Sequence, residues 1–283
     1  MFTVTNLIET FDRQLQASVS AGTKAEATRD WYFWQLKKLK AAAGSLPAAE
    51  LRVWHLNEVK ITNHFARALR ALYGWASDND LTPKNPFLKL QIPKAGQRER
   101  TVSRAELTKL YLACNRQYRR YLFLLAHTMC RPSEIRLLKI EDIDVKNRVI
   151  ILTDFKGKKA RMDGIKARVI PLDRSAVMLI TAMLRQGKGP YLFGGLKPWS
   201  YTSVRSAMRR ARLKAGLNTE GERVVCYTLR HTGATNAMRA GIQTTLLAKI
   251  MGHAKVTTTQ RYQHPTSVDM VEAIDAIHDR KHR

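Results

Sequence analysis

Residues 227–231 read Tyr227-Thr228-Leu229-Arg230-His231, residues 251–253 read Met251-Gly252-His253, and Tyr262 follows nine positions later. A tyrosine hydroxyl can attack phosphorus when cationic and hydrogen-bonding groups neutralise the charge on the non-bridging oxygens. Arg230, His253 and Tyr262 supply both parts, so the stretch indicates phosphoryl transfer through a tyrosine. Each residue alone also fits a plainer role, with Tyr262 a half-buried aromatic and His253 a packed core histidine.

The chain around this stretch is strongly basic. Its 283 residues carry a formal net charge of +26. Residues 1–95 hold 13 Lys and Arg against 8 Asp and Glu, a net of +5, whereas the remainder holds 36 against 15, a net of +21. A cationic surface of this size attracts a polyanion, and nucleic acid is the commonest such partner.

A membrane or secreted location is not expected. No run of about 18 apolar residues is present to span a bilayer, and the N-terminus lacks a basic segment followed by an apolar core. Cys114, Cys130 and Cys226 are too few and too scattered for a disulfide framework or a zinc site. We therefore expect a cytoplasmic protein with reduced, structural cysteines.

The N-terminal third is predicted to be helical and to form a core. Apolar residues recur at helical spacing in two segments: Val4, Leu7, Ile8, Phe11 and Leu15, then Ile61, Phe65, Leu69, Leu72 and Tyr73. Thr23 and Glu26 form a capping box for a further helix that carries Trp31, Trp34 and Leu39. Lys37 and Lys38 lie beside these tryptophans, on either a DNA-facing surface or an ordinary solvated face.

A second domain is predicted to follow a linker. Residues 93–100 are charged and lack periodic apolar residues, which separates a domain at 1–92 from one at 101–283. Ser103 and Glu106 form a capping box where the second domain begins. It should be mostly helical, except that the β-branched runs 148–153 and 167–172 predict a hairpin.

Arg131 precedes Pro132 at the end of an apolar helical segment that is expected to bury His127. The residue before a proline is pushed out of the helical region, and Pro132 suits the first turn of a new helix. Arg131 should therefore lie at a helix junction, where Glu134 can brace its guanidinium. Alternatively, Arg131 is a surface residue and Glu134 simply favours the helix dipole.

These residues, in this order, resemble the tyrosine recombinase (phage integrase) family: Arg131 with Glu134, a hairpin lysine, the Tyr227-x-x-Arg230-His231 box, Met251-Gly252-His253 and Tyr262. The resemblance spans roughly residues 100 to 265, and the N-terminal helices resemble the family's core-binding domain more loosely. It implies a mainly α protein that clamps duplex DNA, with a small antiparallel sheet in the catalytic domain. Lys37, Lys38, Lys158 and Lys159 would contact DNA.

The resemblance also implies a mechanism that needs no cofactor and no metal. Tyr262 would attack a DNA phosphodiester and form a 3′-phosphotyrosyl link, while Arg131 and Arg230 would clamp the non-bridging oxygens. The general acid would be the hairpin lysine, for which we choose Lys156 because it directly follows the first strand. The connection is longer than the family's usual tight turn, so Lys156, Lys158 and Lys159 can instead form a flexible basic loop that binds phosphates.

Two positions depart from the family pattern. Tyr227 replaces the usual histidine of the His-x-x-Arg box, and a phenol can donate a hydrogen bond but is a poor general base near neutral pH. The acceptor of the Tyr262 proton is therefore not assigned, and His231 is expected to be a buried hydrogen-bonding residue. Met129 replaces a glycine, so we expect a local backbone adjustment there.

The chain ends in an apolar stripe, Val268, Val271, Ile274 and Ile277, on a predicted helix that docks either on its own domain or on a neighbouring protomer. By resemblance the protein would be a homotetramer on synapsed DNA sites, a monomer or weak oligomer without DNA, and nucleoid-associated when bound. Site-specific recombination is the predicted function. A type IB topoisomerase-like relaxer and a DNA-binding regulator without cleavage are the alternatives.

Overall fold

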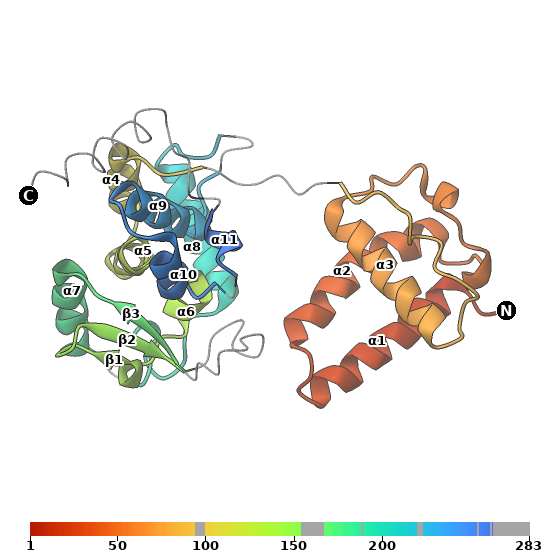
Figure 1. Cartoon of the computed structure of the whole chain (residues 1–283), viewed down its shortest axis with the longest axis horizontal. Coiled ribbons are helices and arrows are strands. Elements are labelled where there is room, and N and C mark those ends of the chain that lie inside the picture. The colour runs from red at the N-terminus through yellow and green to blue at the C-terminus, as the bar shows by residue number, and fades with distance from the viewer. Residues whose placement is uncertain are drawn as a thin grey trace, which may run out of the picture. The chain divides into compact units, whose positions relative to one another are not determined.

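The computed structural model of the chain describes residues 1–93, 100–153, 167–187, 189–219, 223–253, 255–260 and 262. They belong to two compact units, Met1–Gln97 and Arg98–Arg283 (Figure 1). Each unit has its own hydrophobic core.

The N-terminal unit is a three-helix arrangement in which each helix contacts the other two (Figure 1). The helices are α1 (Val4–Ser20), α2 (Glu26–Ala43) and α3 (Asn63–Asp78), with short 3-10 turns η1 (Ala48–Glu50) and η2 (Val53–Leu56) between α2 and α3. Both predicted apolar stripes are confirmed in the core, where Leu7, Leu15 and Phe65 are almost completely buried.

The predicted start of α2 is wrong in detail. The residue that caps α2 is Ala25, and no side chain caps this helix. The Thr23 hydroxyl instead donates a hydrogen bond to the Ser18 carbonyl at 2.8 Å. Because Gly22 adopts a positive φ of 67°, the chain turns sharply after α1, and Thr23 closes the end of that helix instead of opening the next one.

Trp34 is not a core residue, contrary to the prediction. Its side chain is 62% exposed, and the ammonium of Lys37 lies 5.8 Å from its ring centroid. The buried face of α2 carries Leu36, Leu39 and Ala43. Trp34 lies two positions before Leu36, about 200° around the helix axis, and therefore faces away from the core.

The C-terminal unit is mostly helical. Its α-helices are α4 (Arg104–Leu112), α5 (Arg116–Thr128), α6 (Pro132–Arg136), α7 (Arg174–Leu184), α8 (Tyr201–Lys214), α9 (Cys226–Arg239), α10 (Thr244–Met251) and α11 (Thr257–Gln260), with a 3-10 turn η3 (Ile140–Asp142). The predicted capping box is confirmed, since Ser103 and Glu106 exchange hydrogen bonds at the start of α4. Helix α5 supplies a central buried face, including Tyr121 and Leu125.

A small antiparallel sheet lies beside α7 (Figure 1). Its strands are β1 (Ile143–Asp144), β2 (Val149–Leu152) and β3 (Arg168–Pro171), in the order β1-β2-β3. The predicted pairing of β2 with β3 is confirmed, with Ile150 opposite Ile170. Both isoleucines are fully buried. Arg168 of β3 also points inward and is buried.

Several expectations fall outside the described residues. They concern the loop with Lys156, Lys158 and Lys159, and the helix expected after Pro265. Among the helices that the structure does describe, none has the length and apolar character needed to cross a membrane.

Candidate active site

Arg131 lies between two helices, as the Arg131-Pro132 sequence predicts. Helix α5 ends at Thr128, and its C-cap residue Met129 adopts the left-handed conformation with φ of 52°. Helix α6 begins at Pro132 with Arg131 as its N-cap residue. Met129 therefore takes a backbone conformation that glycine adopts without strain. This is the local adjustment that the sequence leads us to expect, and it turns the chain so that Arg131 points into the unit.

Glu134 holds two arginines. Its Oε1 accepts hydrogen bonds from Arg131 Nη1 at 2.8 Å and Arg168 Nη1 at 2.7 Å, while its Oε2 accepts from the Arg131 amide at 2.6 Å and Arg168 Nη2 at 2.8 Å. Burial raises the pKa of Glu134, but the bonds and charge of Arg168, followed by the bonds from Arg131, outweigh it and hold that pKa below its usual value. Glu134 is thus an anion that fixes both guanidinium groups.

Arg168 is a residue that the sequence reasoning missed. Its side chain is 2% exposed and forms an ion pair with Glu134. Its Nη2 also donates a hydrogen bond to Cys130 Sγ at 3.8 Å, so Arg168 is part of the cluster. A signal was present in the alternating pattern of β3. Arg168 lies two positions before the buried Ile170, so the two side chains point to the same, inward face of the sheet. A buried charge in a strand requires a partner, and Glu134 is that partner.

Arg230 is held from three sides. Its Nη1 donates to the Met129 carbonyl at 2.6 Å, and its Nη2 donates to the Met251 carbonyl at 2.8 Å and lies 3.1 Å from His253 Nε2. Burial, and then the charge of Arg131, lower the pKa of Arg230 to about 10. Arg131 reaches the same turn, because its Nη2 donates to the Gly252 carbonyl at 3.0 Å.

The turn after α10 brings His253 and Gly252 into this cluster. His253 is 9% exposed, and its Nδ1 lies 2.7 Å from the Thr259 hydroxyl. Gly252 ends α10 with φ of 67°, and a Cβ there would lie 2.5 Å from Arg168 Nη1. Only glycine therefore allows the turn to approach Arg168 so closely.

Tyr262 adjoins the cluster through α9. Its ring is 6% exposed, and its hydroxyl lies 2.9 Å from Nδ1 of His231, the residue next to Arg230. His231 is half-buried and hydrogen-bonded. The structure thus brings together Arg131, Arg230, His253 and Tyr262, with Glu134, Arg168 and His231 around them.

Tyr227 occupies a different environment. It lies in the first turn of α9, one turn before Arg230 and His231, and its side chain is 47% exposed. Within the part of the chain that the structure describes, the Tyr227 hydroxyl makes no hydrogen bond. It faces solvent, whereas Arg230, three residues later on α9, is buried.

The cluster carries an excess of positive charge. Three guanidinium groups, from Arg131, Arg168 and Arg230, are matched by one carboxylate, from Glu134. A buried excess of positive charge is costly unless an anion neutralises it, and the guanidinium fork suits a phosphate. Across the described ranges no three His, Cys, Asp or Glu side chains gather in a way that would hold a metal ion.

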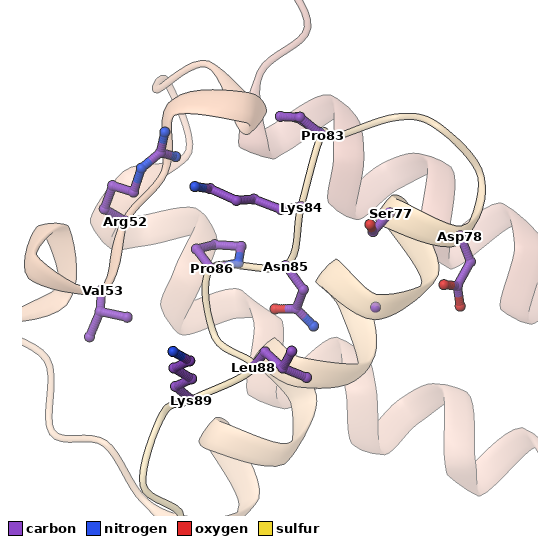
Figure 2. Close-up of a pocket in the computed structure, with 11 residues that line it drawn as sticks. Arg52, Val53, Ser77, Asp78, Pro83, Lys84, Asn85, Pro86, Leu88 and Lys89 are labelled. Atoms are coloured by element: carbon purple, nitrogen blue, oxygen red, sulfur yellow. The ribbon is translucent and has the colours of Figure 1, made fainter.

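Other predicted residues lie apart from this cluster. Lys37 and Lys38 are exposed on α2 of the N-terminal unit. The same unit has a groove of about 700 Å³, in which Arg52, Lys84 and Lys89 contribute cationic side chains (Figure 2). None of the residues around Tyr262 lines this groove.

His127 is exposed at the end of α5, so its predicted place in the core is wrong. Its ring stacks on Phe123 and its Nδ1 lies 2.5 Å from a carboxylate oxygen of Asp173. The core face of α5 includes Tyr121 and Leu125. Leu125 lies two positions before His127, about 200° around the helix axis, so His127 faces away from the core.

The sequence reasoning also missed a basic face on α8. Arg205, Arg209, Arg210 and Lys214 are exposed there, whereas Val204, Met208 and Ala211 face the core. The helical spacing of these apolar residues was the available signal, because it assigns the intervening arginines to the solvent side.

Comparison with known proteins adds to this geometry. Residues 100–268 match the phage integrase family. A tyrosine recombinase of Pseudothermotoga lettingae is 27% identical over 216 residues, which cover 74% of this chain and 72% of the relative. The tyrosine recombinase XerC of Mycobacterium sp. (strain KMS) is 26% identical, and the match covers 98% of each chain.

Solved structures share the fold. The Tn1549 transposon integrase in complex with transposon right end DNA has a TM-score of 0.74 at 19% identity, with 97% of this chain and 99% of that chain covered. A lambda integrase tetramer bound to a Holliday junction has a TM-score of 0.73 at 17% identity, with 91% and 79% covered. The mainly helical fold with a small antiparallel sheet is therefore confirmed.

Proposed function

The chain belongs to the phage integrase family, and from this premise we propose that Arg131, Arg230, His253 and Tyr262 are the catalytic centre of a site-specific DNA recombinase. The protein is a tyrosine recombinase, an enzyme that cleaves and rejoins DNA strands. The observation that carries the site assignment is that Arg131, Arg230 and His253 meet at the turn after α10, with Tyr262 hydrogen-bonded to the residue beside Arg230.

In the proposed reaction the Tyr262 oxygen attacks the phosphorus of a DNA phosphodiester. A bond forms between this oxygen and phosphorus, the bond from phosphorus to the 5′-oxygen breaks, and a 3′-phosphotyrosyl link remains. Arg131 and Arg230 bind the non-bridging oxygens and stabilise the charge that develops on them, while His253 contacts Arg230 through Nε2. Lys156 donates the proton that the departing 5′-oxygen needs.

The reverse reaction completes strand exchange. The phosphotyrosyl link keeps the energy of the broken phosphodiester, so a 5′-hydroxyl from another strand can attack it without an external energy source. Glu134 and Arg168 keep Arg131 in place during cleavage and religation. Arg168 makes a bidentate contact with the Glu134 carboxylate, and this carboxylate accepts the hydrogen bond from Arg131. Tyr227 donates a hydrogen bond to a phosphate oxygen from the exposed side of α9.

The proposed partner is double-stranded DNA, bound by both units as a clamp. The N-terminal unit serves as a core-binding domain with Lys37 and Lys38 facing the DNA backbone, and the exposed arginines of α8 do the same in the catalytic unit. The functional assembly is a homotetramer on two synapsed sites, as in the lambda integrase tetramer bound to a Holliday junction.

A covalent-trapping experiment tests the proposal. The protein is incubated with nicked duplexes drawn from the DNA that flanks its gene, and the products are separated on a denaturing gel. Wild-type protein and Tyr227→Phe are expected to form a covalent adduct, and Tyr262→Phe is expected to form none. An adduct that persists in Tyr262→Phe would overturn the assignment of the nucleophile.

A further inference from the structure

The hydroxyl of Tyr262 has a specific neighbour that the family pattern does not assign to proton transfer. His231 Nδ1 lies 2.9 Å from this hydroxyl, and the two ring centroids are 5.5 Å apart with a 50° tilt. Tyr262 is 6% exposed, so water has little access to its ring. The reacting oxygen of the proposed nucleophile therefore touches an imidazole in the resting protein.

The other groups near the site are poor candidates to accept a proton from the Tyr262 hydroxyl. Tyr227 carries a phenol, which is a much weaker base near neutral pH than an imidazole. His253 uses Nδ1 on the Thr259 hydroxyl and Nε2 on Arg230. At position 227, where the family usually has a histidine, this chain has Tyr227. His231, one helical turn later on α9, is the histidine on this face of the helix.

We propose that His231 is the general base that accepts the proton of Tyr262 during cleavage. The inference rests on the proposed function, because it requires Tyr262 to be the nucleophile. It moves the imidazole of the family's box by one helical turn, from position 227 to position 231. Positions 227 and 231 are four residues apart and share one face of α9.

The proton balance of the step is complete. The step requires neutral His231 with its proton on Nε2, so that the lone pair of Nδ1 takes the proton of Tyr262 as the Tyr262 oxygen bonds to phosphorus. The 5′-oxygen leaves with a proton from Lys156. In religation the 5′-hydroxyl attacks the phosphotyrosine and gives its proton to Lys156. His231 returns its Nδ1 proton to the departing Tyr262 oxygen, so both residues end unchanged.

The test measures single-turnover cleavage of a nicked duplex across a range of pH. His231→Gln keeps a hydrogen-bonding side chain without a basic nitrogen, and His231→Ala opens space for free imidazole. We expect His231→Gln to cleave roughly 10²-fold or more slowly near pH 7, the usual size of a general-base effect. This deficit should shrink as pH rises, because hydroxide can then remove the tyrosine proton in place of His231. Added imidazole should restore part of the rate of His231→Ala.

A modified substrate separates the base from the acid. A 5′-bridging phosphorothiolate leaves as a thiolate and needs no proton, so its cleavage is insensitive to Lys156. His231→Gln should remain slow on this substrate, whereas Lys156→Ala should recover. His127→Gln is the matched control, because it makes the same chemical change at an exposed histidine outside the site. Its rate should equal that of the wild type.

Two results would overturn the inference. One is a cleavage rate of His231→Gln within about threefold of wild type near pH 7, since general-base loss costs far more. The other is a deficit that is equal at every pH and is not relieved by imidazole in a folded His231→Ala, which would leave His231 only a packing role. Melting curves and DNA binding establish that the variants are folded. An adduct in Tyr262→Phe would instead sink the proposed function itself.

Discussion

Glu134 is the residue on which the geometry of the site depends most. Its carboxylate is the shared acceptor for Arg131 and Arg168, and its side chain is only 6% exposed. Removing one partner from a buried ion pair leaves an uncompensated charge, which costs more than the pair itself contributes. In this site two guanidinium groups would lose their counter-ion together.

We expect Glu134→Gln to lower the free energy of unfolding by about 3 kcal/mol, a typical cost of breaking a buried ion pair. Urea denaturation measures this change. Glu141→Gln is the control, because Glu141 is 72% exposed where it pairs with Lys139, and such surface changes stay within about 0.5 kcal/mol. Equal stability of the two variants would show that Glu134 does not hold the arginines.

The lowered pKa of Glu134 also predicts a pH dependence of stability. A carboxyl whose pKa is lower in the folded than in the unfolded state stabilises the fold fully above its unfolded value, near 4.5. This contribution is lost as pH falls from there through the folded pKa. Thermal melts below pH 4.5 should therefore show the stability gap between wild type and Glu134→Gln narrowing, whereas a gap independent of pH would contradict the assignment.

At the scale of elements, α9 carries the site because it packs closely on α5. Gly233 of α9 is the point of closest approach: a Cβ there would lie 2.8 Å from the Ala126 carbonyl oxygen and 2.8 Å from Met129 Cγ. Since Met129 also accepts the hydrogen bond from Arg230, the packing of the two helices and the position of Arg230 are coupled.

Gly233→Ala should destabilise the protein by about 1–3 kcal/mol, the usual cost of forcing an atom into a packed interface. Gly74→Ala is the matched control in α3, where the new Cβ would meet nothing closer than Asn85 Nδ2 at 3.6 Å. That substitution should be neutral or stabilising, because alanine favours a helix by about 1 kcal/mol over glycine. Thermal denaturation of both variants makes the comparison, and a stable Gly233→Ala would contradict the close packing.

The elements that the sequence predicts well are those with a local cause. Apolar spacing predicts α1 and α3, the Ser103 and Glu106 pair predicts the start of α4, and Pro132 predicts the start of α6. The failures depend on longer-range packing. Trp34 and His127 lie on helices that carry many apolar residues, and packing against other elements determines which face of each helix is buried. Strand β1 is only two residues long, too short for a pattern to show.

The same distinction applies to the site. The order and spacing of Arg131, Arg230, His253 and Tyr262 can be read from the chain through a family resemblance. The contact of Arg168 with Glu134 joins residues 34 positions apart, and that of Tyr262 with His231 joins residues 31 apart. Local patterns carry no information on such pairings, so only the folded chain reveals them.

At the scale of the whole molecule, the charge determines how DNA is bound. The net charge is +26, of which +21 falls after residue 95, and α8 presents exposed arginines on one face. Binding that neutralises many phosphates releases counterions and weakens steeply with salt. Sequence discrimination must come from other contacts, because backbone phosphates are alike at every site.

DNA affinity should fall by roughly 10³-fold or more between 50 and 200 mM salt, as expected for six or more phosphate contacts. Fluorescence anisotropy with a labelled duplex measures this dependence. Arg209→Gln should reduce the slope of log affinity against log salt by about 1, the effect of losing one phosphate contact. An unchanged slope would show that α8 does not face the DNA backbone.

The most direct test of the central claim is identification of the DNA-bearing peptide by mass spectrometry. The trapped complex is digested with nuclease and trypsin, and the fragment that retains a nucleotide is sequenced. Tyr262 falls in the tryptic peptide 262–280 and Tyr227 in the peptide 224–230, so the two tyrosines are distinguished without ambiguity. We predict the nucleotide on Tyr262; a nucleotide on Tyr227 or on any other residue would contradict the account.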